Sequence, residues 1–199
     1  MGFDPFSMGR KMMTSTGMLM GQNEFKKELK LSGDQNKKIS DLAKNHQKKI
    51  QEMTKKAQSS GPDMGAMTAQ MKEMDDLNDE TDKAIRAELT PEQSRRLSQL
   101  QWQIVGVKAV YEPDLQKELG LSEDQLTKLA EWKKGENSRM MALVQASRSA
   151  NAMKDARKKI KKDDETNILG ILQPDQLQKY KLALGPESKV AKKLSESGF

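Results

Sequence analysis

The chain has 199 residues, of which 32% are charged, 35% hydrophobic and only 4% aromatic, and its formal net charge is +6. This composition argues against a thick globular core and suits long helices with narrow apolar stripes. The absence of cysteine excludes disulfides, thiol nucleophiles and thiolate metal sites, and it is compatible with a reducing or an oxidising compartment.

The first elements in chain order are a leader and two helices. Residues 1–21 are rich in Gly and Met and predict a flexible leader with no signal peptide. Residues 22–30 predict a short lead-in helix, and residues 33–58 predict a long helix whose apolar side chains recur every three or four residues. His46 lies on that apolar stripe. No apolar run in the chain reaches the roughly 18 residues that a membrane span needs.

A second long helix is predicted from Pro62 to about residue 88, after a break at residues 59–61. The helix before the break is mainly basic and the one after it mainly acidic, which favours an antiparallel hairpin. If the chain turns near Ser60, Met53 should face Met67, and His46 should approach Met74.

A connecting helix and a second set of helices follow. Residues 90–111 predict one continuous helix that joins the halves of the chain, and residues 113–118 predict another short lead-in helix. A helix from Glu123 should break near residues 146–151, and a return helix should carry apolar side chains as far as Ile171. A short helix over 174–184 comes next, and residues 186–199 predict a frayed tail.

Four copies of a Leu-x-x-acid-Gln motif mark the predicted helix starts. Ser and Thr hydroxyls can accept hydrogen bonds from free backbone N–H groups, and a Gln three residues later completes a capping box. The fourth copy has Gln173 in place of the hydroxyl residue. Helix capping accounts for the motif without any ligand. The motif residues are Leu31, Ser32, Gln35, Leu89, Thr90, Gln93, Leu121, Ser122, Gln125, Leu172 and Gln176.

The spacing of the motifs predicts an internal duplication. The first two copies are 58 residues apart and the last two are 51 apart. The difference of seven residues is two helical turns, so an apolar stripe keeps its phase. The sequence therefore predicts an all-α fold of two tandem helical-hairpin units, residues 22–111 and 112–185, joined by the long connecting helix.

The motif at residues 89–93, Leu-Thr-Pro-Glu-Gln, and its three variants resemble the signature of the LTxxQ-motif family of Spy-like and CpxP-like periplasmic proteins of bacteria. The resemblance covers roughly residues 22–185 and implies a small all-helical protein in the periplasm. Spy-like members are ATP-independent chaperones, CpxP-like members regulate the envelope stress response, and related proteins bind metals. Family members dimerise as a curved cradle. This chain departs from the family in its tandem units, which predict a monomeric pseudo-dimer or a homodimer.

The sequence does not predict an enzyme. It has one histidine, no Gly-rich phosphate loop and no Glu-x-x-His pair, so acid–base, phosphoryl-transfer and di-iron chemistry have no support. His46, on the apolar stripe, is better placed for a core than for a general base.

A stripe of methionines has three interpretations. Met64, Met67, Met71 and Met74 follow one another at helical spacing. They could fill the hairpin seam, or they could form an adaptable surface for client proteins. With His46 they could also hold copper as Cu(I), the weak metal candidates being His46, Met71 and Met74. No cofactor is predicted.

Paired lysines on the predicted first hairpin suggest charge steering rather than nucleic-acid binding, because the aromatic side chains that stack on bases are scarce. The lysines of the predicted client surface are Lys48, Lys49, Lys55 and Lys56. The leading hypothesis is a non-enzymatic, ATP-independent chaperone-like or envelope-stress protein that binds unfolded or envelope proteins on a basic, Met-bearing concave face. A copper- or zinc-sensing or buffering protein and a purely structural helical module are the alternatives.

Overall fold

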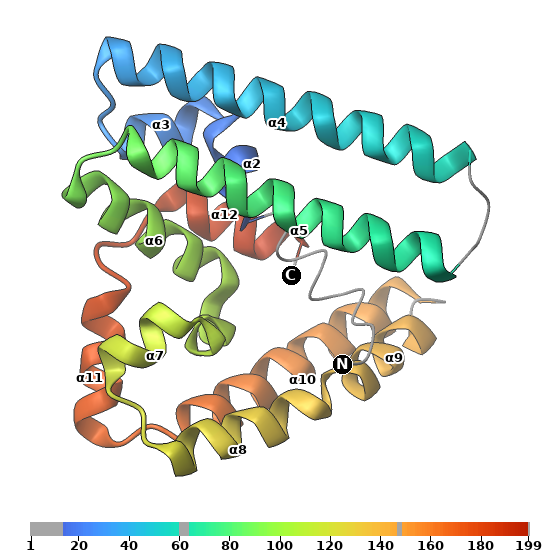
Figure 1. Ribbon diagram of the computed structural model, residues 1–199. Helices are drawn as coiled ribbons and strands as arrows, with labels where there is room; N and C mark the ends of the chain where they lie inside the picture. The colour runs from blue at the N-terminus through green and yellow to red at the C-terminus, as the bar shows by residue number, and fades with distance from the viewer. Residues whose placement is uncertain (1–13, 60–63, 147–148, 199) are drawn as a thin grey trace.

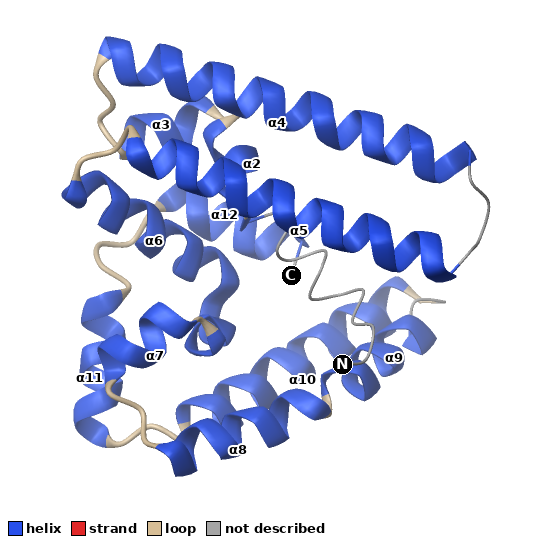
Figure 2. Ribbon diagram, viewed as in Figure 1, coloured by secondary structure: helices blue, strands red, loops and turns tan. Residues whose placement is uncertain are grey.

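The computed structural model describes residues 14–59, 64–146 and 149–198 of the chain. These residues form helices joined by short turns, and none of them lies in a strand (Figure 2). The all-α prediction is therefore confirmed. Within the same ranges, no helix combines the length and the apolar character that a bilayer crossing requires.

The first half of the chain forms a long antiparallel hairpin that packs against short helices (Figure 1). The long helices begin and end close to where the sequence predicts them. The elements are α2 (Thr16–Met20), α3 (Asn23–Glu28), α4 (Gly33–Ser59), α5 (Met64–Ala87) and α6 (Pro91–Val105).

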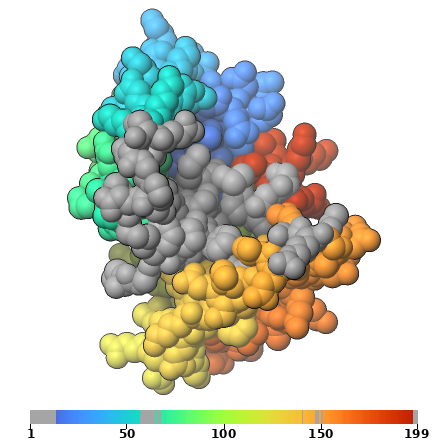
Figure 3. All heavy atoms as spheres, turned by 90° about the vertical axis from the view of Figure 1, so that its right-hand side faces the viewer, coloured from blue at the N-terminus to red at the C-terminus, as the bar shows by residue number. Residues whose placement is uncertain are grey.

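The second half repeats this order with a bent arm. Helices α8 and α9 are separated only by Gly135, and α10 returns along them (Figure 1). The two hairpins reach toward the same side of the molecule and lie one above the other (Figure 3). The elements are the 3₁₀ helix η1 (Gly106–Tyr111), α7 (Pro113–Leu119), α8 (Glu123–Lys134), α9 (Glu136–Ala146), α10 (Ala150–Leu169), α11 (Pro174–Ala183) and α12 (Lys189–Gly198).

The prediction of a flexible leader over residues 1–21 is wrong for its described part. Helix α2 packs against α4 and α5, and the side chains of Leu19 and Met20 are fully buried. Burying such side chains is worth about 1.5–3 kcal/mol each, which offsets the cost of ordering a short segment. Residues 1–13 lie outside the described residues.

The prediction of a frayed tail over residues 186–199 is also wrong. Helix α12 packs against α6, where Ala191 is fully buried and Val190 and Leu194 are partly buried. The Ser188 hydroxyl accepts a hydrogen bond from the Ala191 N–H at 3.2 Å and donates to Glu28 at 2.8 Å. These contacts anchor the start of α12 to the first half of the chain.

The predicted continuous helix over residues 90–111 breaks at Gly106. This glycine has φ 70° and ψ −141°, a conformation that side chains with a Cβ rarely adopt. Residues 106–111 then form η1, whose Ala109 and Val110 belong to the core of the second half. The first half likewise includes Leu19 and Met20 in its core. The boundary between the halves therefore falls near Gly106 rather than at residue 111.

Replacing Gly106 with alanine should reduce the free energy of unfolding by about 1–3 kcal/mol. A Cβ at this position would meet no atom within 4 Å, so the loss would come from backbone strain alone. Gly120, with φ 64° and ψ 47°, is the control, because Lys30 adopts a similar positive φ of 50° at the same place before its motif. Urea unfolding should rank Gly106→Ala as the more damaging change. Equal midpoints for the two variants would contradict the strain argument.

Six pairs of buried side chains occupy matched positions in the two halves. Matched positions are counted from Gln35 and Gln125 before each hairpin turn, and from Gln93 and Gln176 after it. Each residue of the pairs named next is at most 2% exposed. The pairs are Leu19 with Ala109, Met20 with Val110, Phe25 with Leu115, Leu29 with Leu119, Ile39 with Leu129, and Ile85 with Ile168.

Candidate functional site

The glutamines of the first two motifs join the two ends of the first hairpin. Gln35 Nε2 donates to Gln93 Oε1 at 2.8 Å, and Gln93 Nε2 donates back to Gln35 Oε1 at 3.1 Å. Each amide also donates to a backbone carbonyl of the opposite turn, Gln35 to Glu88 at 2.7 Å and Gln93 to Lys30 at 3.4 Å. We call this arrangement a glutamine clasp.

A second glutamine clasp closes the second hairpin at matched positions. Gln125 and Gln176 exchange hydrogen bonds at 2.6 Å and 3.1 Å. Gln125 donates to the Ile171 carbonyl at 2.8 Å, and Gln176 donates to the Gly120 carbonyl at 3.2 Å. Because both glutamines here are at most 8% exposed, these bonds are better shielded from water than those of the first clasp.

The capping interpretation of the motif is confirmed. The Gln93 backbone N–H donates to the Thr90 hydroxyl at 3.2 Å, and the Thr90 N–H donates to Gln93 Oε1 at 2.9 Å. Ser32 and Ser122 make the same pair of bonds with their own glutamines. In the fourth motif, the Gln173 N–H donates to Gln176 Oε1 at 2.9 Å. The motifs thus cap helices and, through the clasps, hold the hairpins closed.

One residue of the methionine stripe, Met74, lies in the seam of the first hairpin. Met74 is 4% exposed and packs in a cluster with Ile50, Met53 and Leu77, and Met71 is half-buried. The side chains of Met64 and Met67 lie outside the described residues. The seam interpretation therefore holds for Met74, and client binding by the other three methionines stays a prediction.

The weak metal candidates do not come together as predicted. His46 is 2% exposed, and its Nδ1 lies 3.0 Å from the Thr81 hydroxyl. Thr81 is two helical turns, or about 10 Å, further along α5 than Met74. The register of α4 against α5 therefore differs from the predicted one, in which His46 approaches Met74. Among the described residues, no group of three or more His, Cys, Asp or Glu side chains could hold a metal ion.

The four predicted lysines are exposed on α4, and the client surface that they were predicted to form stays a prediction. Lys49 and Lys56 border an open groove of about 550 Å³ between α4 and α5. Four acidic side chains border the same groove, so its lining carries charges of both signs. These acids are Glu52, Glu73, Asp76 and Glu80.

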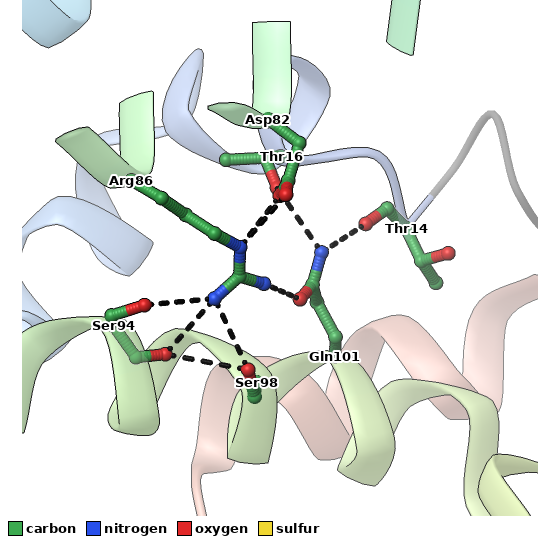
Figure 4. A network of polar contacts seen from close by, with 7 residues as sticks. All are labelled: Thr14, Thr16, Asp82, Arg86, Ser94, Ser98 and Gln101. Carbon is green, nitrogen blue, oxygen red and sulfur yellow. Dashed lines mark hydrogen bonds and ion pairs between the residues drawn. The ribbon is translucent and has the colours of Figure 1, made fainter. Parts of the chain in front are cut away.

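A larger depression of about 640 Å³ lies between α5 and α6 and is mainly acidic. A polar network on its wall centres on Arg86 (Figure 4). The guanidinium donates to Asp82 at 2.8 Å, to the Ser94 hydroxyl at 3.0 Å and to Gln101 at 3.0 Å. Thr16 donates to the Asp82 carboxylate, and Gln101 donates to the Thr14 carbonyl at 3.0 Å. Since the guanidinium is fully engaged, the network serves to fasten α2 to α5 and α6.

An apolar stripe on the outer face of α8 and α9 was not predicted. Leu126 is 37% exposed, Met141 55% and Val144 49%. Leu126 lies on α8, and Met141 and Val144, three residues apart, lie on the same face of α9. The matched positions on α4 carry Asn36, Gln51 and Thr54, all exposed and all polar. The second hairpin therefore presents apolar side chains to solvent where the first presents polar ones.

A buried ion network supports the arm beneath this apolar stripe. Lys108 of η1 lies 2.6 Å from Glu136 and 3.2 Å from Asp164, and both carboxylates are 3% exposed. Asp164 also accepts from the Trp132 ring N–H at 3.0 Å, and the Arg139 guanidinium lies over that ring at 4.0 Å. These contacts fix the start of α9 against α10 and η1.

The two features that sequence reasoning missed share a signal. Leu126, Met141 and Val144 are apolar where the matched residues are polar, and Glu136 and Asp164 are charged where the matched residues are His46 and Thr81. Position-by-position comparison of the halves would have singled out both sets.

No family model, curated protein or solved structure matches this chain significantly.

Proposed function

We propose that the protein is a non-enzymatic, ATP-independent, chaperone-like protein that binds partly unfolded or partner proteins through the apolar stripe of its second hairpin. The observation that carries the proposal is the exposure of Leu126, Met141 and Val144 at positions where the first hairpin is polar. Burying exposed apolar side chains against an apolar partner removes them from water and favours association. Met141 is flexible and polarizable, which suits contacts with varied apolar partners.

Charge on the same hairpin supports the proposal. Five exposed basic side chains lie within six residues of α10, next to the helix that carries Met141 and Val144. Such a cluster attracts acidic chains over several ångströms and raises the rate of encounter. Three separated apolar side chains give shallow contacts, so captured chains should be released without ATP. The basic residues are Arg157, Lys158, Lys159, Lys161 and Lys162.

The compartment and the origin of the two halves form part of the same proposal. We place the protein in the bacterial periplasm because its motifs resemble those of the LTxxQ family. We infer that one hairpin unit was duplicated within the chain, which would give a monomer the two-armed form of a dimer. The matched glutamine clasps and the matched buried side chains support this inference.

The test is suppression of the aggregation of a chemically denatured client without ATP, followed by light scattering. The native chain should suppress aggregation at an equimolar ratio. The combined variant Leu126→Asn, Met141→Gln and Val144→Thr, which gives the arm the residues of α4, should lose most of that activity and remain folded.

The matched control neutralises the surface predicted on the first hairpin. Replacing Lys48, Lys49, Lys55 and Lys56 with glutamine should leave suppression largely intact. Equal suppression by the native chain and the stripe variant would overturn the assignment of the binding surface. Absence of suppression by the native chain would overturn the proposed function.

A further inference from the structure

Helix α2 rests directly on the imidazole of His46. Gly17 lies against the ring so closely that a Cβ at this position would fall 2.5 Å from His46 Cδ2. Only glycine fits there without moving the ring or the helix. Leu19 and Met20, later in the same helix, complete the apolar core of the first half. The docking of residues 14–21 therefore depends on how His46 sits beneath them.

The surroundings of His46 suit a neutral imidazole. The ring is 2% exposed, Nδ1 pairs with the Thr81 hydroxyl, and Nε2 has no hydrogen-bond partner among the described residues. A neutral ring can leave one nitrogen unpaired at modest cost. An imidazolium has two N–H donors and a net charge, and a buried charge without an acceptor is strongly unfavourable.

In the part of the chain that the structure describes, no charged group near the ring can compensate for a proton. On α4, Lys49 is the charge that acts on the ring, and as a cation it disfavours protonation. On α5, the carboxylate of Asp82 is already bound by Arg86 and Thr16. Helix α2, with the sequence Thr-Gly-Met-Leu-Met, has no titratable side chain. Burial, and to a smaller extent Lys49, lowers the pKa of His46 below its ordinary value of 6.5.

We propose that His46 makes the docking of α2 sensitive to acid, so that protonation of this imidazole releases residues 14–21 and uncovers the apolar face beneath them. The direction of the pH dependence follows from the difference between the pKa of His46 in the docked state and in the released state. Since the folded pKa is lowered, the docked state keeps its full stability above about pH 6.5, the ordinary pKa of the freed imidazole. It loses stability as the pH falls from there through the lower pKa of the docked state.

The second half has no such switch. Its matched positions hold Glu136 and Asp164, which Lys108 of η1 pairs directly at 2.6 Å and 3.2 Å. The chain has a single histidine, so the imidazole response belongs to the first half alone. Acid should therefore free α2 while η1 stays in place. This inference is independent of the proposed chaperone-like function.

The single histidine makes the experiment direct. Proton NMR of the full chain between pH 8 and pH 5 follows the one imidazole, and hydrogen exchange at the same pH values gives protection factors for residues 16–20 and 107–111. The imidazole should titrate below pH 6.5. Protection of residues 16–20 should fall at least tenfold over the same range, while that of residues 107–111 should hold.

Two variants complete the test. His46→Gln should abolish the acid-dependent loss of protection in residues 16–20. Lys49→Gln, at an exposed position, removes a repelling cation and should raise the pH at which the docked imidazole titrates. Because the docked state then tolerates the proton better, the loss of protection should become smaller and its midpoint should move to lower pH. This variant keeps the test valid if His46→Gln fails to fold. The proposal is overturned if protection survives titration of the imidazole, or if Lys49→Gln leaves the midpoint unchanged.

Discussion

Replacing Asp164 with alanine should lower the free energy of unfolding by about 3–5 kcal/mol, because the largely buried cations Lys108 and Arg139 are then balanced by one carboxylate, Glu136, in place of two. Asp164 is 3% exposed and accepts from the Trp132 ring at 3.0 Å, while Lys108 lies 3.2 Å and Arg139 3.5 Å from its carboxylate. The variant loses all three interactions and opens a small cavity. Chemical denaturation followed by tryptophan fluorescence would measure the loss, with Trp132 reporting directly on the site.

Giving the second half the residues of the first half distinguishes two quantities. One is the net contribution of the ion network to the free energy of unfolding, and the other is the loss when a single partner is removed. Positions 108, 136 and 164 match Met18, His46 and Thr81 of the first half. The combined variant Lys108→Met, Glu136→His and Asp164→Thr also needs Val107→Gly, because Gly17 is the residue that leaves room for the matched imidazole. It removes the three ion-paired side chains and should recover part of the stability that Asp164→Ala loses, since replacing a whole buried ion pair is often nearly neutral.

Asp155→Ala is the control for both variants. Asp155 is exposed on the same helix, and its replacement should change stability by no more than about 0.5 kcal/mol. If Asp164→Ala unfolded at the same denaturant concentration as the native chain, the network would not hold α9 in place. The apolar stripe would then lie on an arm that the ion network does not stabilise.

Replacing Gln125 with alanine should lower the free energy of unfolding by about 2–4 kcal/mol, the sum of a lost cap and of buried polar groups left unpaired. The Gln125 side chain accepts from the Ser122 N–H, donates to the Ile171 carbonyl and exchanges hydrogen bonds with Gln176. The variant loses all of these hydrogen bonds together. Gln176, which is 7% exposed in the native chain, is left without its main partner.

The same substitution in the first clasp provides the comparison. Gln35→Ala should cost less, because Gln35 is half-exposed and water can replace part of the clasp. Gln178→Ala, an exposed position on α11, should change stability by at most about 0.5 kcal/mol. The urea midpoint should be lowest for Gln125→Ala, higher for Gln35→Ala and highest for Gln178→Ala. A Gln125→Ala midpoint equal to that of Gln178→Ala would show that the glutamines cap helices without holding the hairpin.

The motifs determined the helix starts. Thr90, Ser122 and their glutamines act within a span of three residues, so the hydrogen bonds of each capping box depend on the local sequence alone. Their spacing likewise predicted two helical hairpins in order. The sequence could not show that Gln35 would bind Gln93, because that contact joins residues 58 apart in the chain and requires the hairpin to be closed.

The tertiary structure decided what lies inside and what is exposed. Leu19 and Ala191 belong to segments that are unremarkable by themselves, and they are ordered because the first half offers them an apolar surface. The register of α4 against α5 placed His46 beside Thr81 rather than near Met74. Burial and register depend on contacts between distant segments, whereas capping depends on neighbours. This is why local patterns predicted the long helices of the first hairpin and the helix starts at the motifs. Helices α2 and α12, the break at Gly106, the contact of α2 with His46 and the exposure of the apolar stripe follow only from contacts in the folded chain.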